Sequence, residues 1–337
     1  MTTYRQTDPW TGLAGWVLVR RASVTLGLVG LLVGCGERPE PPISLDSPPT
    51  NMPFVVVLGN AQDGGHPQAG TAPGPAWSPE RRRYATSLAV VDPSTGERWL
   101  FEATPDFRDQ LHALDRIAPS QDTPGLAGIF LTHAHIGHYT GLIHLGREAM
   151  GAQGVSVYAM PRMIDFLSTN GPWDQLVELG NIDLLPLQAN EPVQLNDRIA
   201  VTAILVPHRD EYSETVGYLI DGPERTLFFL PDIDKWERWE AEGTRIEDVV
   251  AGVDVAYLDG TFFEDGEIPG RAMSEIPHPF VVETMARFRT ADASERAKIR
   301  FIHLNRTNPA LFADSPEHHR IESAGFNVAE PLEIVGL

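Results

Sequence analysis

Short apolar runs, many of them rich in β-branched residues, recur along the chain and are separated by polar turns and by stretches with helical spacing. The apolar runs predict strands near residues 54–58, 86–92, 98–102, 128–131, 155–158, 184–187, 199–205, 215–220, 227–230, 255–258 and 300–303. Apolar residues at helical spacing predict helices over residues 107–117, 133–150, 163–179, 234–241, 246–250 and 278–289. Because each strand-rich half ends in helices, the pattern predicts a layered α/β fold.

Local signals mark the ends of some of these elements. Asp106 stands in position to cap the helix predicted from Phe107. Residues 93–96 (Pro-Ser-Thr-Gly) predict the turn of a hairpin between the second and third strands. The segment 60–78 holds many glycines and prolines, so we expect an irregular loop there.

The N-terminal segment has a different character. Arg20 and Arg21 precede a short apolar run over residues 22–34, which is the pattern of a secretory signal peptide and is too short to span a bilayer comfortably as a helix. Cys35 follows Leu-Val-Gly, so this site resembles the lipobox of bacterial lipoproteins, in which the cysteine is lipidated and becomes the new N-terminus. The alternative is a buried strand that ends in an ordinary cysteine.

These signals predict three parts. Residues 1–34 are expected to be a lipoprotein signal peptide, residues 35–53 a proline-rich tether, and residues 54–337 one folded domain. The chain is therefore expected to be exported and anchored in a membrane through its lipid, on the periplasmic or cell-surface face.

Charge and cysteine content narrow the chemistry. The formal net charge of −20 argues against nucleic acid as a partner, because phosphate binding requires stripes of lysine and arginine. A small-molecule substrate is the expectation that remains. Cys35 is the only cysteine, so the chain can form neither an intramolecular disulfide nor a thiolate zinc site.

The strongest chemical signal is a histidine cluster, His133-Ala-His135-Ile-Gly-His138, directly after an apolar strand. His133 and His135 alternate along the chain and can point the same way, and His138 returns to that side at the start of a helix. Imidazole nitrogen is a good ligand for zinc, iron or copper at neutral pH. Histidines that cap helices or bond to loop carbonyls are the alternative, but the spacing favours a metal centre.

Three later residues also follow apolar strands: His208, Asp232 and His303. Each of them alone would be an ordinary loop residue. A sheet positions side chains most rigidly at its strand ends, so their recurrence after the histidine cluster supports the metal centre.

At this point the residues resemble the metallo-β-lactamase superfamily, whose pattern is HxHxDH, a distant histidine, a bridging aspartate and a final histidine. The resemblance implies an αββα sandwich with the metals at one edge, between the two sheets. The ligands that it implies are His133, His135, His138, His208, Asp232 and His303.

A narrower resemblance is to the branch that contains the pyrroloquinoline-quinone biosynthesis protein B family. It rests on residues 58–67 (LGNAQDGGHP), 104–110 (TPDFRDQ) and 304–309 (LNRTNP), and the whole likeness spans roughly residues 54–310. Three positions depart from these patterns. Gly137 replaces the aspartate that would bind a second metal, Thr71 stands where a structural-zinc cysteine is expected, and Arg306 stands where a histidine is expected. The departure at Gly137 implies a weaker second metal site.

Further site residues are expected around the centre. Asp259 is predicted to orient a ligand histidine, or else to form a turn before Gly260. His278 is predicted to donate a proton at the mouth of the site, or else only to begin a helix. The loop of Asp63, Gly64, Gly65 and His66 is expected on the substrate side by its family position, the alternative being a tight turn with positive φ.

The expected function is hydrolysis of a small phosphodiester, ester or lactone by metal-bound hydroxide, with Asp232, His278 and Asp259 as catalytic groups. The expected cofactor is zinc, one or two ions, with iron or manganese as alternatives. Two other functions stay open. One is an iron-dependent oxidative enzyme like the quinone-biosynthesis proteins, and the other is a lipoprotein that binds a metal or ligand without catalysis.

Overall fold

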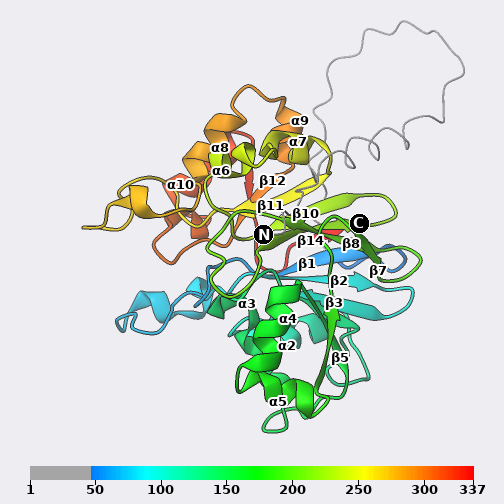
Figure 1. Cartoon of the computed structure of the whole chain (residues 1–337). Coiled ribbons are helices and arrows are strands. Elements are labelled where there is room, and N and C mark those ends of the chain that lie inside the picture. Colours follow the sequence, from blue (N-terminus) through cyan, green and yellow to red (C-terminus); the bar gives the residue numbers. More distant parts are fainter. Residues whose placement is uncertain (1–46) are drawn as a thin grey trace, which may run out of the picture.

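The computed structural model describes residues 47–337. Within them, two seven-stranded sheets pack face to face, with helices on both outer faces (Figure 1). The first sheet has the order β14-β1-β2-β3-β4-β5-β6 and the second β13-β12-β11-β10-β9-β8-β7. The predicted αββα sandwich is confirmed.

The strands of the first sheet are β1 (Phe54–Gly59), β2 (Ser87–Asp92), β3 (Glu97–Phe101), β4 (Gly128–Phe130), β5 (Val155–Ala159), β6 (Ile182–Pro186) and β14 (Ile334–Gly336). The strands of the second are β7 (Pro192–Gln194), β8 (Ala200–Leu205), β9 (Val216–Asp221), β10 (Thr226–Leu230), β11 (Val255–Asp259), β12 (Ile299–Ile302) and β13 (Asn327–Val328). The first sheet is covered by α2 (Phe107–Ile117), α3 (Ile136–Tyr139), α4 (Pro161–Thr169) and α5 (Trp173–Glu178). The second is covered by α6 (Trp236–Ala241), α7 (Ile246–Ala251), α8 (Val281–Arg287), α9 (Ala293–Ala297) and α10 (Pro316–Ser323).

The core has three apolar layers, and the alternation of side chains along each strand divides residues between them. In β1, Val55 and Val57 face the second sheet, whereas Phe54, Val56 and Leu58 face the helices on the first sheet. Because both faces of a central strand are buried, its sequence is a continuous apolar run instead of an alternating one. This explains why the apolar runs located the strands so well.

Strand direction brings the sequence-predicted site residues to one edge. In the first sheet β1, β3 and β4 run parallel to one another, because β2 is antiparallel to both of its neighbours. In the second sheet β8, β10, β11 and β12 also share one direction. The carboxyl ends of these strands meet where Leu304 N–H donates to Asn60 O at 2.9 Å across the two sheets.

Some sequence predictions about helices are wrong. The helix expected over residues 133–150 is one turn, α3, followed by a 3₁₀ segment (Thr140–Leu145). Gly141 packs so closely that a Cβ there would lie 2.2 Å from the carbonyl of Thr104, and its amide donates to Ala103 O at 2.8 Å. These tertiary contacts replace the helical ladder.

The helix expected over residues 163–179 is divided into α4 and α5, because Pro172 has no amide hydrogen and disfavours helical backbone before it. Pro279 acts in the same way, so α8 starts at Val281 and His278 precedes it. Asp106 occupies the N-cap position of α2 but does not cap it. Its carboxylate instead accepts a hydrogen bond from the amide of Ala85 at 2.9 Å.

Several short elements were missed, namely β7, β13, β14, α9 and α10. The predicted signal peptide, Cys35 and most of the tether lie outside the described residues. Among residues 47–337, no helix combines the length and the apolar character needed to cross a membrane.

Candidate metal centre

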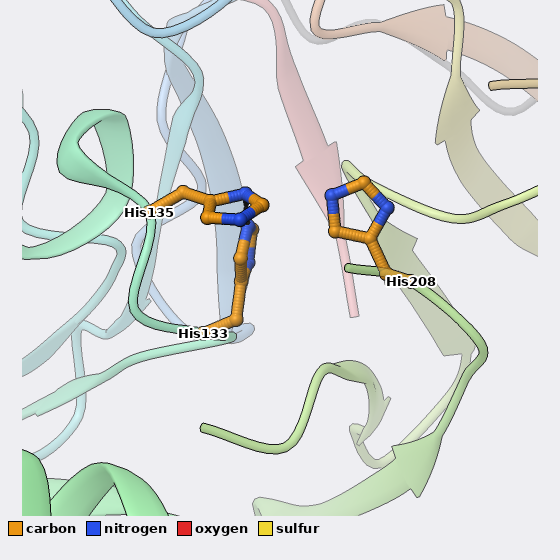
Figure 2. Close-up of side chains that lie close together, drawn as sticks. All are labelled: His133, His135 and His208. Carbon is orange, nitrogen blue, oxygen red and sulfur yellow. Dashed lines mark hydrogen bonds between the residues drawn. The ribbon is translucent and has the colours of Figure 1, made fainter. Parts of the chain in front are cut away.

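Three histidines form one ligand group at the edge of the sandwich. His133 and His135 come from the loop after β4, and His208 comes from the loop after β8 in the other sheet. Figure 2 shows the rings of His133 and His135 together, facing the ring of His208. One ring nitrogen from each lies within 4.8 Å of the others. His135 is the most exposed of the three, and its Nε2 lies 3.2 Å from Glu211 Oε2.

A second group, His138 and His303, lies beside the first, and Asp232 lies close to both groups. Oδ2 of Asp232 lies 3.0 Å from His138 Nε2 and 3.2 Å from His303 Nε2. The same carboxylate lies 3.9 Å from His133 Nε2 and 3.7 Å from His208 Nε2. Asp232 therefore stands between the two histidine groups, as the sequence pattern implied for a bridging residue.

Four of the ligand histidines have polar partners at Nδ1, which leaves Nε2 of His138, His208 and His303 for the centre, while Nε2 of His133 lies 2.8 Å from Nδ1 of His135. The partners are Thr132 Oγ1 for His133 (2.9 Å), Glu102 Oε1 for His138 (3.2 Å), Asp234 Oδ1 for His208 (3.2 Å) and Thr261 Oγ1 for His303 (3.0 Å). Such partners fix the orientation and the tautomer of metal-binding imidazoles.

Sequence reasoning missed all four partners. Thr132, Asp234 and Thr261 lie within two residues of His133, Asp232 and Asp259, so proximity to a predicted site residue was an available signal. Glu102 had no such signal, because it follows β3 and reaches His138 only through the fold.

Burial and mutual charge shift the pKa values in the cluster. Desolvation lowers the pKa of His133 well below its ordinary value, and the neighbouring His138 adds to the effect. Burial alone would lower the pKa of His138 as well, but Glu102 and Asp232 raise it well above its ordinary value. Burial acts to raise the pKa of Asp232, but His303 and His138 hold it well below its usual range. Without a metal, these pKa shifts therefore favour a protonated His138 beside an ionised Asp232.

The donor set fits a divalent transition metal. The described residues offer no hydrogen bond of normal geometry to five buried atoms that face one another: Asp63 Oδ1, His138 Nε2, His208 Nε2, Asp232 Oδ2 and His303 Nε2. Buried polar atoms almost always have a partner. Converging imidazole nitrogens and carboxylate oxygens are the donors that zinc uses in catalytic sites.

Backbone strain marks the same edge. Glu102 and His303 have φ values of 75° and 63°, and Asp63 has a φ of 31°. Residues other than glycine rarely adopt a positive φ, and those that do concentrate at functional sites. Glu102 and His303 directly follow β3 and β12, so the unusual backbone turns their side chains toward the cluster.

His278 and Asp259 form a pair beside Asp232. Asp259 Oδ2 accepts from His278 Nδ1 at 2.7 Å, and the same nitrogen lies 3.7 Å from Asp232 Oδ1. Burial opposes the charged form of His278, but Asp259 raises its pKa to about 9. Asp259 also accepts from the amides of Ile233 and Thr261. Asp259 therefore contacts His278, which is not one of the predicted metal ligands, and it also has the backbone contacts of a turn residue.

The residues of the loop predicted on the substrate side do not all face the site. Asp63 Oδ1 lies 3.3 Å from His138 Nε2, whereas Nδ1 of His66 bonds to the carbonyl of Arg81 at 2.8 Å. Gly65 has a φ of 66°, and its amide donates to Gln62 O at 2.9 Å, so the tight turn is present as well. Gly64 lies within this turn.

Arg306, which stands where the family pattern has a histidine, is exposed.

The sandwich and its metal-ligand groups define the class of protein. A sequence profile described as the beta-lactamase superfamily domain matches residues 97–303, and the chain belongs to this superfamily. Within it, the chain belongs to the branch of coenzyme PQQ synthesis protein B. The predicted family is thus confirmed.

Relatives in this branch align over nearly their whole length. The coenzyme PQQ synthesis protein B of Xanthomonas campestris pv. campestris (strain B100) is 30% identical over 313 residues, covering 83% of this chain and 99% of the relative. The crystal structure of Zn²⁺-bound PqqB from Methylobacterium extorquens has a TM-score of 0.69 and 25% identity, covering 84% of this chain and 100% of that one. A diphosphatase from the PhnP family shares the fold, with a TM-score of 0.58, 19% identity and coverage of 85% and 98%.

Proposed function

We propose that this protein is a metal-dependent hydrolase of a small molecule with a phosphodiester, ester or lactone bond. The observation that carries the proposal is the pair of histidine groups beside Asp232, with buried ligand atoms that face one another and have no hydrogen-bond partner among residues 47–337. A zinc ion held there would act as a Lewis acid and lower the pKa of a bound water to about 7.

In this proposal, different residues of the chain bind the metals and orient the water. His133, His135 and His208 would hold the first metal, and His138 and His303 would belong to the second site. Asp232 lies between the two groups and would orient a water there.

We assign His278 the role of proton donor to the leaving group. Asp259 holds its ring at Nδ1, beside Asp232. Asp259 is a positioning residue, because it acts through His278.

A second candidate function is an oxidative reaction with bound iron. The observation that favours it is the 30% identity to a coenzyme PQQ synthesis protein B over nearly the whole length of that relative. Oxygen consumption distinguishes the two functions, because only the oxidative reaction consumes oxygen when the protein holds ferrous iron.

We also propose that the protein is exported and anchored through a lipid on Cys35. The support is the sequence pattern of basic residues, apolar run and Leu-Val-Gly-Cys. Residues 36–53 would then tether the domain to the membrane surface.

The test combines metal analysis with a substrate panel. Purified protein should contain at least about half an equivalent of transition metal, and less would count against the whole proposal. Wild type should hydrolyse at least one substrate among phosphodiesters, esters and lactones, and His133→Ala and Asp232→Ala should abolish that turnover. The control is His319→Ala, a histidine on α10 with a side chain that is 65% exposed. Stoichiometric metal without turnover of any substrate or of oxygen would favour the non-catalytic binding lipoprotein.

A further inference from the structure

Gly137 has no room for the aspartate that the superfamily pattern places there. A Cβ atom on Gly137 would lie 2.1 Å from Asp63 Oδ1 and 2.5 Å from Asp63 Cα. Because the second of these atoms belongs to the backbone, rotation of the Asp63 side chain cannot relieve the clash. Residue 137 can therefore carry a side chain only if residue 63 gives up its present place.

The carboxylate in that place faces the second ligand group. Asp63 Oδ1 lies 3.3 Å from His138 Nε2 and 3.9 Å from His303 Nε2. The three side chains form a candidate metal-binding set. His138 and His303 are at most 2% exposed, and their Nε2 atoms make no hydrogen bond within the described residues. The side chain of Asp63 is 48% exposed, but its Oδ1 is buried and likewise makes no hydrogen bond within the described residues.

The backbone holds Asp63 in register with His303. The amide of Gln62 donates to Leu304 O at 2.9 Å, so the residues before Asp63 and after His303 are joined directly. The side chain of Asn305 donates to Gln62 Oε1 as well. Asp63 itself has a positive φ of 31°. A carboxylate that reached the cluster only as a mobile surface group would not need a strained and pinned backbone.

We propose that Asp63 is a ligand of the second metal and replaces the aspartate that is absent at Gly137. The two positions have exchanged roles: a carboxylate enters from the loop after β1, and a glycine on α3 makes room for it. Asp63, His138, His303 and Asp232 then complete the second site, and the centre holds two metals. This inference rests on the proposed metal-dependent function, and it contradicts the weaker second site expected from Gly137.

The experiment measures zinc binding by the full chain, independently of activity. Metal-free protein is titrated with Zn²⁺ against a chromophoric chelator, and bound zinc is counted by mass spectrometry after dialysis. Wild type should bind about two equivalents and Asp63→Ala about one. Asp63→Asn, which keeps the shape of the side chain and removes its charge, should also bind about one equivalent, because a neutral amide oxygen is a weaker metal ligand than a carboxylate. The matched control is Asp265→Ala, an exposed aspartate that also precedes a glycine, and it should bind as wild type does.

Each outcome has a defined meaning. If Asp63→Ala binds two equivalents of zinc with unchanged affinity, the exchange is overturned. It is also overturned if wild type and Asp63→Ala both bind one equivalent. In either case the proposed metal-dependent function would stand. Less than about half an equivalent in wild type would refute the proposed function together with the exchange. Circular dichroism checks the folding of each variant. If Asp63→Ala does not fold, Asp63→Asn decides, since its binding of one equivalent supports the proposal and two equivalents of unchanged affinity overturn it.

Discussion

The pair Asp259 and His278 offers a sharp test of how the buried site is held. Asp259 is fully buried, and each of its carboxylate oxygens accepts two hydrogen bonds. Oδ1 accepts from the amide and the hydroxyl of Thr261 at 2.9 and 2.7 Å. Oδ2 accepts from the amide of Ile233 at 3.1 Å and from His278 Nδ1 at 2.7 Å. Because an ionised carboxylate only accepts, Nδ1 of His278 must carry the proton.

Asp259→Asn keeps the shape of the side chain but cannot keep this pattern. Whichever way the amide is turned, its NH₂ group faces a buried backbone N–H, that of Thr261 or that of Ile233. A buried donor without a partner costs about 1–3 kcal/mol, and the loss of the charge-assisted bond to His278 adds about 1–2 kcal/mol. We therefore expect the free energy of unfolding of the metal-free protein to fall by about 2–5 kcal/mol.

The assay is urea unfolding followed by tryptophan fluorescence, with metal removed so that ligand binding does not contribute. With a urea m-value of about 3 kcal/mol/M, the midpoint should fall by about 0.7–1.7 M. The control is Asp254→Asn, just before β11, where an exposed carboxylate accepts from Thr226 N–H. Water can replace that bond, so the control should change stability by less than about 0.5 kcal/mol. Equal midpoints for the two variants would refute the reasoning about buried donors.

Three other predictions follow from single contacts. Arg98→Met should lower the free energy of unfolding by about 3 kcal/mol, because the buried guanidinium bonds to Asp115 and to three backbone carbonyls, and an unchanged urea midpoint would contradict this. Tyr218→Phe should cost about 1 kcal/mol in the same titration, since its hydroxyl donates to Leu131 O across the two sheets; wild-type stability would argue against a contribution from this bond. Cys35→Ser should abolish incorporation of labelled palmitate and release the protein from membranes, whereas unchanged membrane association would exclude a lipid anchor on Cys35.

The longer strands were predictable because local sequence carries their signal. Runs such as Phe54–Gly59 are buried on both faces, so they contain no polar side chain. The helices were less predictable where tertiary contacts override helical spacing. After His138 the backbone hydrogen-bonds to Ala103, and the chain leaves the helical path that its apolar spacing favours.

Within the centre, the ligands that follow strands were predictable, and the residues that support them were only partly so. The sequence by itself determined the layered fold and the histidine spacing, and its likeness to known patterns indicated which residues after the strands would meet. Only the tertiary structure decided that Glu102 lies behind His138 and that Asp63 occupies the space beside Gly137. The physical reason is that these contacts join residues far apart in the chain, through strand order and turn geometry. A glycine at position 137 shows that a side chain is missing, but only the folded backbone shows which other residue fills its place.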